Sequence, residues 1–342
     1  MKEIRVSSNE AGQRLDKLLK RYLNTAPDSF IYKMLRKKNI TLNGKKASGK
    51  EMVARDDLVK IFLADDTLAK FSDLNWSTSD EKSGGQQNNT AKQVHAAPLE
   101  RSMILYEDEH ILLLNKPLGI LSQKSAPQDI SMNERLTAYL LESGQISPGE
   151  LQTFRPAVCN RLDRNTSGIL TAGRSLAGLQ MLSRILKDRS LHKYYICLVK
   201  GQIRDPSYLE GYLVKDEKSN RVTVSEEDPG DGQKIITEYR PVEYCGGYTL
   251  LEVLLVTGRS HQIRAHLAST GHPIVGDKKY GDRDCNRYFE QRYHLKNQFL
   301  HAGRVVFPEM EGSFSALSGK EFEAAMPAVF QRILKEGRKG EL

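Results

Sequence analysis

The first fifth of the chain has an apolar pattern that predicts two short helices followed by a small sheet. In residues 13–23, apolar side chains recur at helical spacing and cations occupy the opposite face. Ser29 can serve as the N-cap of a second helix, which ends in the basic residues 36–38. Residues 40–46 predict a strand, an Asn-Gly turn and another strand, and residues 57–63 predict a further strand.

The chain then becomes polar between residues 65 and 100, with small side chains and no apolar period. Such a segment cannot bury enough apolar surface to offset the entropy that is lost on ordering. We therefore expect a flexible linker at 65–100, between a small domain of residues 1–64 and a larger one of residues 101–342. The linker would let the small domain dock independently of the large one.

The larger segment mixes short apolar runs with alternating ones, a pattern typical of a strand-rich α+β fold. A hairpin is expected at 103–117, where an acidic turn separates two apolar runs. Further strands are expected at 157–159, 193–199, 237–242 and 248–256. Helices are expected at 136–141 and after Gly258, and the segment 167–186 is expected to turn through Ile169 and Leu170 into a helix around Leu176, Leu179, Met181, Leu182 and Ile185. The fold class is therefore α+β, with a mixed, mainly antiparallel sheet and flanking helices.

Charge is distributed unevenly along the sequence. The chain has 51 Lys and Arg against 43 Asp and Glu, a formal net charge of +8. The first 64 residues hold 15 of these cations and 7 of these acids, which leaves 36 of each for the remainder. A basic module on a neutral body indicates a polyanionic partner such as nucleic acid. An anionic membrane surface is the alternative, but the cations do not accompany a helical face rich in Trp or Phe.

Several classes of protein are excluded by the same sequence. No apolar run approaches the roughly 20 residues that span a bilayer, and the N-terminus lacks the apolar stretch of a signal peptide, so we expect a cytoplasmic protein. The four cysteines lie far apart without a Cys-x-x-Cys pair, which argues against a zinc site or a disulfide framework. His261 and His266 are five residues apart, an offset that does not place two metal ligands on one helical face. We expect no bound metal.

One acidic residue stands out as a candidate for chemistry. Asp163 lies between Arg161 and Arg164, ahead of a polar turn and an apolar run. Neighbouring cations favour the ionised carboxylate, which can act as a nucleophile or a base. The alternative is a surface ion-pair cluster that contributes little.

Three motifs of this chain resemble those of the RluA family of pseudouridine synthases. They are Asn-Arg-Leu-Asp-Arg-Asn-Thr-Ser-Gly at 160–168, Lys-Tyr-Tyr at 193–195 and Gly-Arg-Ser-His-Gln-Ile-Arg-Ala-His at 258–266. Residues 115–119 and 300–302 fit the same family. Residues 12–63 resemble the alpha-L RNA-binding domain first known from a small-subunit ribosomal protein. The resemblance implies a pseudouridine synthase fold and isomerisation of uridine to pseudouridine in RNA, with 23S ribosomal RNA as the expected partner.

The resemblance also implies a role for each matching residue. Asp163 would be the catalytic carboxylate, Arg264 would keep it ionised and oriented, and Tyr195 would lie against the target base. Contacts with RNA are expected from Asn160, Arg161, Arg164 and Leu300 around the site and from Lys33, Arg36, Lys37 and Lys38 on the small domain. We expect a monomer. We also expect that no cofactor is needed, because the isomerisation is redox-neutral.

The sequence departs from the family at Asn160, where a His is usual, and Asn cannot become cationic. This departure bears on contacts with the substrate more than on the reaction. Whether Asp163 attacks covalently or works through a glycal intermediate stays open. Two other functions also remain: an RNA-binding protein without catalysis, and an Asp-dependent nucleoside hydrolase that would release free uracil.

Overall fold

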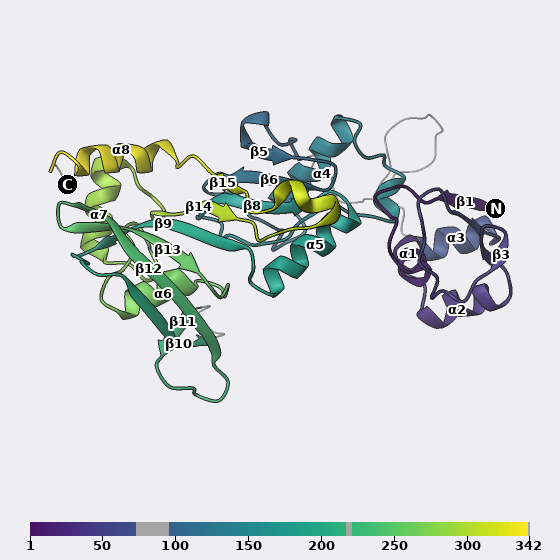
Figure 1. Cartoon of the computed structure of the whole chain (residues 1–342), viewed down its shortest axis with the longest axis horizontal. Coiled ribbons are helices and arrows are strands. Elements are labelled where there is room, and N and C mark those ends of the chain that lie inside the picture. The colour runs from purple at the N-terminus through teal and green to yellow at the C-terminus, as the bar shows by residue number, and fades with distance from the viewer. Residues whose placement is uncertain (73–95, 217–220, 341–342) are drawn as a thin grey trace.

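The computed structural model describes residues 1–72, 96–216 and 221–340. Figure 1 shows a small module of residues 1–72 at one end and a larger body, residues 96–216 and 221–340, extending away from it. Most of the predicted linker, residues 73–95, lies outside the described residues. At the start of that linker the prediction is wrong, because Asp65–Phe71 forms helix α3. Phe71 packs on Phe30 of the module at a ring-centroid distance of 4.4 Å, and this apolar contact favours the ordered helix.

The module has the two helices and the small sheet that its apolar pattern predicts. The helices are α1 (Leu15–Tyr22) and α2 (Asp28–Arg36). The strands are β1 (Lys2–Arg5), β2 (Ile40–Leu42), β3 (Lys45–Lys46) and β4 (Leu58–Ile61), in the sheet order β1-β4-β2-β3. The apolar faces of both helices pack on this sheet, and Leu15, Leu18 and Leu19 are fully buried. The cations of the helices stay on the outer face.

The body is built on one 11-stranded sheet with the order β11-β10-β12-β13-β9-β14-β8-β6-β5, which β7 and β15 join at the side. Its strands are β5 (Ile104–Glu107), β6 (Ile111–Lys116), β7 (Ala157–Val158), β8 (Ser167–Gly173), β9 (His192–Lys200), β10 (Ser207–Asp216), β11 (Arg221–Ser225), β12 (Gln233–Cys245), β13 (Tyr248–Leu255), β14 (Leu300–Val306) and β15 (Glu321–Glu323). Among the named strands of the described ranges, only β8 and β14 pair in parallel. The expected α+β class with a mainly antiparallel sheet is confirmed.

Helices cover the sheet on both faces (Figure 1). They are α4 (Met132–Glu142), α5 (Leu176–Lys187), α6 (Gln262–Ser269), α7 (Arg283–Tyr293) and α8 (Ala328–Gly337), with short 3-10 turns at Arg101–Met103, Glu150–Gln152 and Gly312–Leu317. Alternate residues of β6 show the division: Leu112 and Leu114 join the core that holds α4, while Ile111 and Leu113 join the core that holds α5. A strand that is buried on both faces has no polar alternation.

Burial on both faces also explains an error in the sequence interpretation. The segment through Ile169 and Leu170, expected as a turn that leads into a helix, is instead strand β8 in the interior of the sheet, and all of its residues are buried. A continuous apolar run does not distinguish a buried strand from a buried helix. The helix that was expected around Leu176 and Ile185 is present as α5, and it begins where the Ser175 side chain accepts a hydrogen bond from the Gly178 N–H. Because β8 follows the Asp163 loop, its position in the sheet fixes one end of that loop.

The module contacts the body directly. Asn9 accepts a backbone hydrogen bond from Leu176 at 3.2 Å, and Arg21 Nη1 donates to the Thr153 carbonyl at 3.3 Å. The Thr153 hydroxyl donates to the Glu10 carboxylate, which is buried. Burial raises the pKa of Glu10. The expectation of a module that docks independently does not describe this arrangement.

Gly168 allows β8 to approach β14 and gives a test of this pairing. Its φ is +111°, and a Cβ built there would lie 2.2 Å from the Ala302 carbonyl oxygen. We expect Gly168→Ala to lower the free energy of unfolding by about 3 kcal/mol or more, from backbone strain and overpacking. Urea unfolding measures this value. Gly258→Ala is the matched control, because no atom lies within 4 Å of its Cβ position and its φ is not positive; equal losses in both variants would contradict the close-approach argument.

Candidate active site

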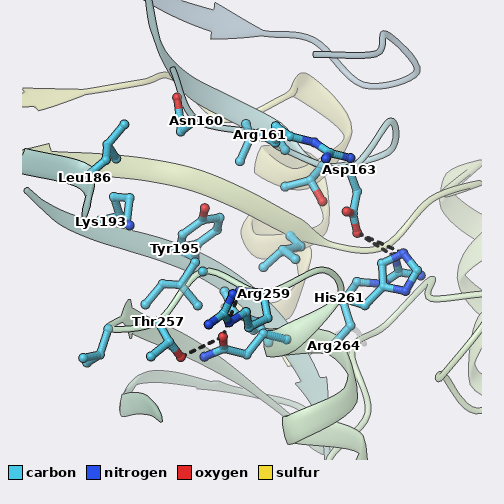
Figure 2. Close-up of a pocket in the computed structure, with 18 of the residues that line it drawn as sticks. Asn160, Arg161, Asp163, Leu186, Lys193, Tyr195, Thr257, Arg259, His261 and Arg264 are labelled. Carbon is cyan, nitrogen blue, oxygen red and sulfur yellow. Dashed lines mark hydrogen bonds and ion pairs between the residues drawn. The ribbon is translucent and has the colours of Figure 1, made fainter. Parts of the chain in front are cut away.

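The loop between β7 and β8 presents Asp163 at the wall of a cavity of about 540 Å³. The Asp163 side chain is 30% exposed, and its Oδ2 accepts a hydrogen bond from Arg264 Nη1 at 2.7 Å. The chain turns at once, because the Thr166 N–H donates to the Asp163 carbonyl at 3.0 Å. Figure 2 shows the Asp163 carboxylate pointing toward His261 and Arg264. The expected pairing of Asp163 with Arg264 is present, while the catalytic roles of both stay predictions.

Arg264 lies on α6 and binds a second carboxylate behind the cavity. Its Nε and Nη2 donate to Asp277 Oδ2 and Oδ1 at 2.7 and 2.9 Å, a bidentate pair. Asp277 is fully buried and also accepts backbone hydrogen bonds from Lys279 and Tyr280. Burial acts to raise the pKa of Asp277, but the Arg264 hydrogen bonds and charge outweigh it, and the pKa is lowered. Arg264 is therefore held by a permanent anion while its third nitrogen faces Asp163.

His261 is the second group that faces the carboxylate. It stands just before α6 with φ 58°, and its Nε2 lies 3.7 Å from Asp163 Oδ2. Its Nδ1 is 3.0 Å from the Tyr280 hydroxyl, which itself accepts from the Val222 N–H at 3.1 Å. Because Val222 occupies one acceptor position of that hydroxyl, we assign its proton to His261 Nδ1 and the imidazole proton to Nε2, facing Asp163. Burial lowers the pKa of His261, which favours the neutral ring despite the opposing charge of Asp163.

Tyr195 lies on β9 and contributes its ring to the same cavity (Figure 2). It is 5% exposed and lies opposite Ala302 of β14 in the register. Burial, with a further contribution from the Asp163 charge, raises the pKa of Tyr195, so its hydroxyl stays protonated at neutral pH. Leu300 also lines the cavity. Tyr194 points to the other face, as strand alternation predicts, where the Arg304 guanidinium lies 3.8 Å from its ring centroid.

Lys116 fixes the Asp163 loop through hydrogen bonds to backbone carbonyls. The sequence predicted only a loop at residues 115–119. Its Nζ is buried and donates to three carbonyls, those of Pro117 at 3.0 Å, Ile120 at 2.7 Å and Arg164 at 3.0 Å. Three acceptors match the three hydrogens of an ammonium group. Burial lowers the pKa of Lys116 to about 7, and the nearby Asp163 charge opposes that shift. These hydrogen bonds connect the end of β6 to Arg164, the residue that follows Asp163.

The other residues expected near Asp163 have different positions. The Asn160 side chain lines the cavity, but it accepts from Thr171 N–H at 2.7 Å and donates to the Ile169 carbonyl at 3.2 Å, so it ties the loop to β8. Arg161 is exposed and lines the cavity, whereas Arg164 is exposed and lies outside the lining. Arg161 thus lies at the cavity, as expected. The hydrogen bonds of the Asn160 side chain with the backbone of β8 could not be seen in the sequence.

The cations expected to bind RNA on the module are separate from this cavity. They are exposed on α2 and just beyond it: Lys33, Arg36, Lys37 and Lys38. Within the described part of the chain, no group of three His, Cys, Asp or Glu side chains could hold a metal ion. His266 is instead buried, with Nδ1 3.0 Å from the Thr237 hydroxyl. No helix in the described ranges is long and apolar enough to cross a membrane.

The cavity walls are strongly cationic. Six Lys or Arg side chains line it, with Asp163 as the only carboxylate among the described residues that do so. The cations are Arg161, Lys187, Arg189, Lys193, Arg259 and Arg264. A cavity with one oriented carboxylate, one buried aromatic ring and excess positive charge is suited to an anionic ligand that carries a flat group.

Comparison with known proteins agrees with this chemistry. Residues 110–269 match the family model described as RNA pseudouridylate synthase. The ribosomal large subunit pseudouridine synthase C of Vibrio cholerae is 30% identical over 305 residues, which cover 89% of this chain and 88% of that protein. The protein of the same name from Escherichia coli strain K12 is 30% identical over 315 residues, which cover 90% and 88%.

The fold is also found among solved structures. The structure of human RNA pseudouridylate synthase domain containing 4 has a TM-score of 0.55 and 17% identity to this chain. The match covers 69% of this chain and 92% of the human one. At this identity the likeness concerns the fold alone.

The buried Arg264–Asp277 pair gives a second test. We expect Asp277→Asn to lower the free energy of unfolding at pH 7 by about 3 kcal/mol, because it removes one charge from a buried ion pair. Urea unfolding monitored by circular dichroism measures the loss. Asp284→Asn is the control, since the Asp284 side chain is 88% exposed and its pair with Arg287 is a surface contact. A similar loss in the two variants would contradict a special role for the buried pair.

The same variant makes a prediction about pH. The pKa of Asp277 is lowered in the folded protein, so its stabilising effect is present above the unfolded pKa of about 3.9 and is lost as pH falls through the folded value. The stability difference between wild type and Asp277→Asn should therefore shrink as the pH is lowered below about 4. Unfolding curves at a series of pH values from neutral to acidic test this. A difference that grows on acidification would contradict the assigned direction.

Proposed function

Because the chain belongs to the RNA pseudouridine synthase family, we propose that it isomerises specific uridines of large-subunit ribosomal RNA to pseudouridine. The family makes the chain an RNA pseudouridine synthase. The names of its relatives support the large ribosomal subunit as the source of the substrate. The single observation that carries the mechanism is the Asp163 carboxylate, held by Arg264 at 2.7 Å in a cavity that also contains the Tyr195 ring.

The reaction explains why a fixed carboxylate is needed. The bond from ribose to the ring nitrogen must break, the uracil must turn, and a new bond must form from ribose to carbon 5, which loses its proton. Asp163 acts on the sugar or the base, either as a nucleophile or by stabilising and deprotonating the ribose. Arg264 orients the carboxylate through the hydrogen bond from its Nη1, and His261 Nε2 stands 3.7 Å away on the same side. No metal or cofactor is required, since the reaction is redox-neutral.

The walls of the cavity would hold the base during this rearrangement. Tyr195 supplies a flat face for the uracil, and Leu300 supplies an apolar contact beside it. Because the raised pKa of Tyr195 keeps its hydroxyl protonated, it acts in the resting enzyme as a stacking surface and hydrogen-bond donor. A uridine in folded RNA must leave its stack to reach Asp163, at a cost of a few kcal/mol. Arg161, exposed at the cavity, is placed to occupy the vacated space or bind a phosphate.

The N-terminal residues 1–64 form an RNA-binding domain in this proposal, and residues 101–342 form the catalytic domain. The exposed cations on and after α2 would contact phosphates, which give affinity more than sequence selection. The bonds from Asn9, Glu10 and Arg21 to the body hold this surface in a fixed relation to the cavity. A single copy of the enzyme, which we propose is a monomer, would therefore bind RNA at two places.

Asp163→Asn should abolish pseudouridine formation while leaving RNA binding, because the amide keeps the shape of the side chain but neither attacks nor accepts a proton as a carboxylate does. Single-nucleotide mapping of pseudouridine in ribosomal and transfer RNA, from cells with wild-type, variant or no enzyme, measures the effect. The Asp284→Asn variant, which changes an exposed side chain, should restore pseudouridine at every site that is lost without the enzyme.

Each alternative function has its own result in this experiment. A variant that modifies RNA as well as wild type would reject Asp163 as the catalytic residue. If cells without the gene keep pseudouridine at every mapped site, the assignment as an enzyme acting on ribosomal or transfer RNA is rejected. Release of free uracil from RNA, with no pseudouridine, would indicate a nucleoside hydrolase.

Replacing Lys33, Arg36, Lys37 and Lys38 together by Gln tests the proposed RNA-binding domain. Each lost phosphate contact should reduce the slope of log affinity against log salt by about 0.7 to 0.9, and binding should weaken at all RNA sequences alike. Fluorescence anisotropy of a labelled ribosomal RNA fragment at several salt concentrations measures both. An unchanged slope would show that the module does not hold RNA through these cations.

A further inference from the structure

The cavity extends beyond the position expected for one uracil. From Asp163 it passes Tyr195 and reaches Lys193 on β9 and the end of α5 at Lys187 and Arg189. Residues two apart on a strand face the same side and lie about 7 Å apart. Lys193 therefore stands beside Tyr195, one step further along the same wall. Figure 2 shows Lys193 on the side of Tyr195 away from Asp163 and His261.

The cations at this end have no acidic partner in the described part of the chain. Lys187, Arg189 and Lys193 are absent from every ion pair of those residues. Asp163, the carboxylate in the lining, already binds Arg264. Lys193 is half-buried, and burial followed by the charge of Arg189 lowers its pKa. Two like charges at a partly buried wall disfavour each other, and an anion between them would relieve that repulsion.

Arg189 occupies a backbone position that usually favours glycine. Its φ is 66°, immediately after the C-cap of α5, and the Leu191 N–H closes the helix end on the Ile185 carbonyl at 3.1 Å. A side chain in this left-handed conformation carries backbone strain that a glycine would avoid. Favourable interaction of cations with the C-terminal end of a helix could account for Lys187 and Arg189. It does not account for Lys193, which lies on a strand and faces the same cavity.

The chemistry of this end fits a phosphodiester better than a base. The Tyr195 ring lies on the Asp163 side, and Leu186 of α5 lines the cavity next to Lys187. Guanidinium and ammonium groups bind phosphate oxygens by charge-assisted hydrogen bonds. We propose that Lys193 and Arg189 form a subsite for one phosphodiester of the RNA strand next to the target uridine, an inference that rests on the proposed function. The subsite fixes the direction in which the strand crosses the cavity.

Neutral RNA linkages test this subsite at single-phosphate resolution. The probes are short single-stranded RNA oligonucleotides that contain one uridine, each with one phosphodiester near it replaced by an uncharged methylphosphonate. Binding to the full-length chain is measured by fluorescence anisotropy at several salt concentrations. We expect one linkage beside the uridine to weaken wild-type binding roughly tenfold, as for the loss of a charged hydrogen bond. The double variant Lys193→Gln/Arg189→Gln should bind the RNA with the neutral linkage at that position as tightly as it binds the unmodified RNA.

The matched variants separate the subsite from general charge. Lys193→Gln/Arg189→Gln should reduce the salt slope by about 0.7, the value for one phosphate of a single strand. Lys335→Gln removes an exposed cation of α8 and should leave the slope unchanged. Lys193→Arg should keep most of the affinity, since it retains the charge. Because Arg189 is exposed, Arg189→Gln alone provides the measurement if the double variant is unfolded.

The outcomes decide the two proposals separately. Equal sensitivity of wild type and the double variant to every neutral linkage, with an unchanged salt slope, would overturn the subsite. Specific loss at one linkage with no pseudouridine formed by wild type on any ribosomal RNA would support the subsite and overturn the proposed function. Because the binding measurement needs no turnover, failure of catalysis does not affect the test.

Discussion

The site depends on one buried cation that is shared by two carboxylates. Arg264 donates two hydrogen bonds to Asp277, which is fully buried, and one to Asp163, which faces the cavity. Arg264 is thus fixed before any substrate arrives, because its orientation is set by the buried partner. A guanidinium suits this arrangement, since its planar fork can bind one carboxylate with two nitrogens and still offer a third. A lysine at this position could not satisfy both acids with the same geometry.

The same site also depends on the sheet that brings distant segments together. The Asp163 loop joins β7 to β8, Arg264 stands on the helix after β13, and Tyr195 comes from β9. Lys116, at the end of β6, bonds the carbonyl of Arg164 and so fixes the loop beside these elements. Buried backbone carbonyls require hydrogen-bond donors, and the lysine supplies three donors at one point. The same hydrogen bonds therefore position Asp163 and stabilise its loop.

Electrostatics connects the module with the cavity. Within the described part of the chain, Arg264 is the one cation of the cavity lining that forms an ion pair, while the exposed cations of α2 lie on the separate module. Unpaired positive charge destabilises a folded protein, so its retention at a cavity indicates an anionic ligand. A polyanion can meet both surfaces at once, since the buried contact between Glu10 and Thr153 joins the module to the body.

The sequence by itself determined the class of fold and the uneven charge, and its motifs indicated three candidate residues that the structure brings to one cavity. Asp163, Tyr195 and Arg264 could be named because each lies in a local motif, and the helices of the module could be named because their apolar faces repeat every turn. Only the tertiary structure decided that the apolar run at 167–173 is a strand, since burial on both faces removes the alternation that would reveal it. It also decided the roles of Asp277, Lys116 and His261, whose partners are distant in the sequence or are backbone atoms. Local spacing carries no information about such contacts, because they form only when the sheet is assembled.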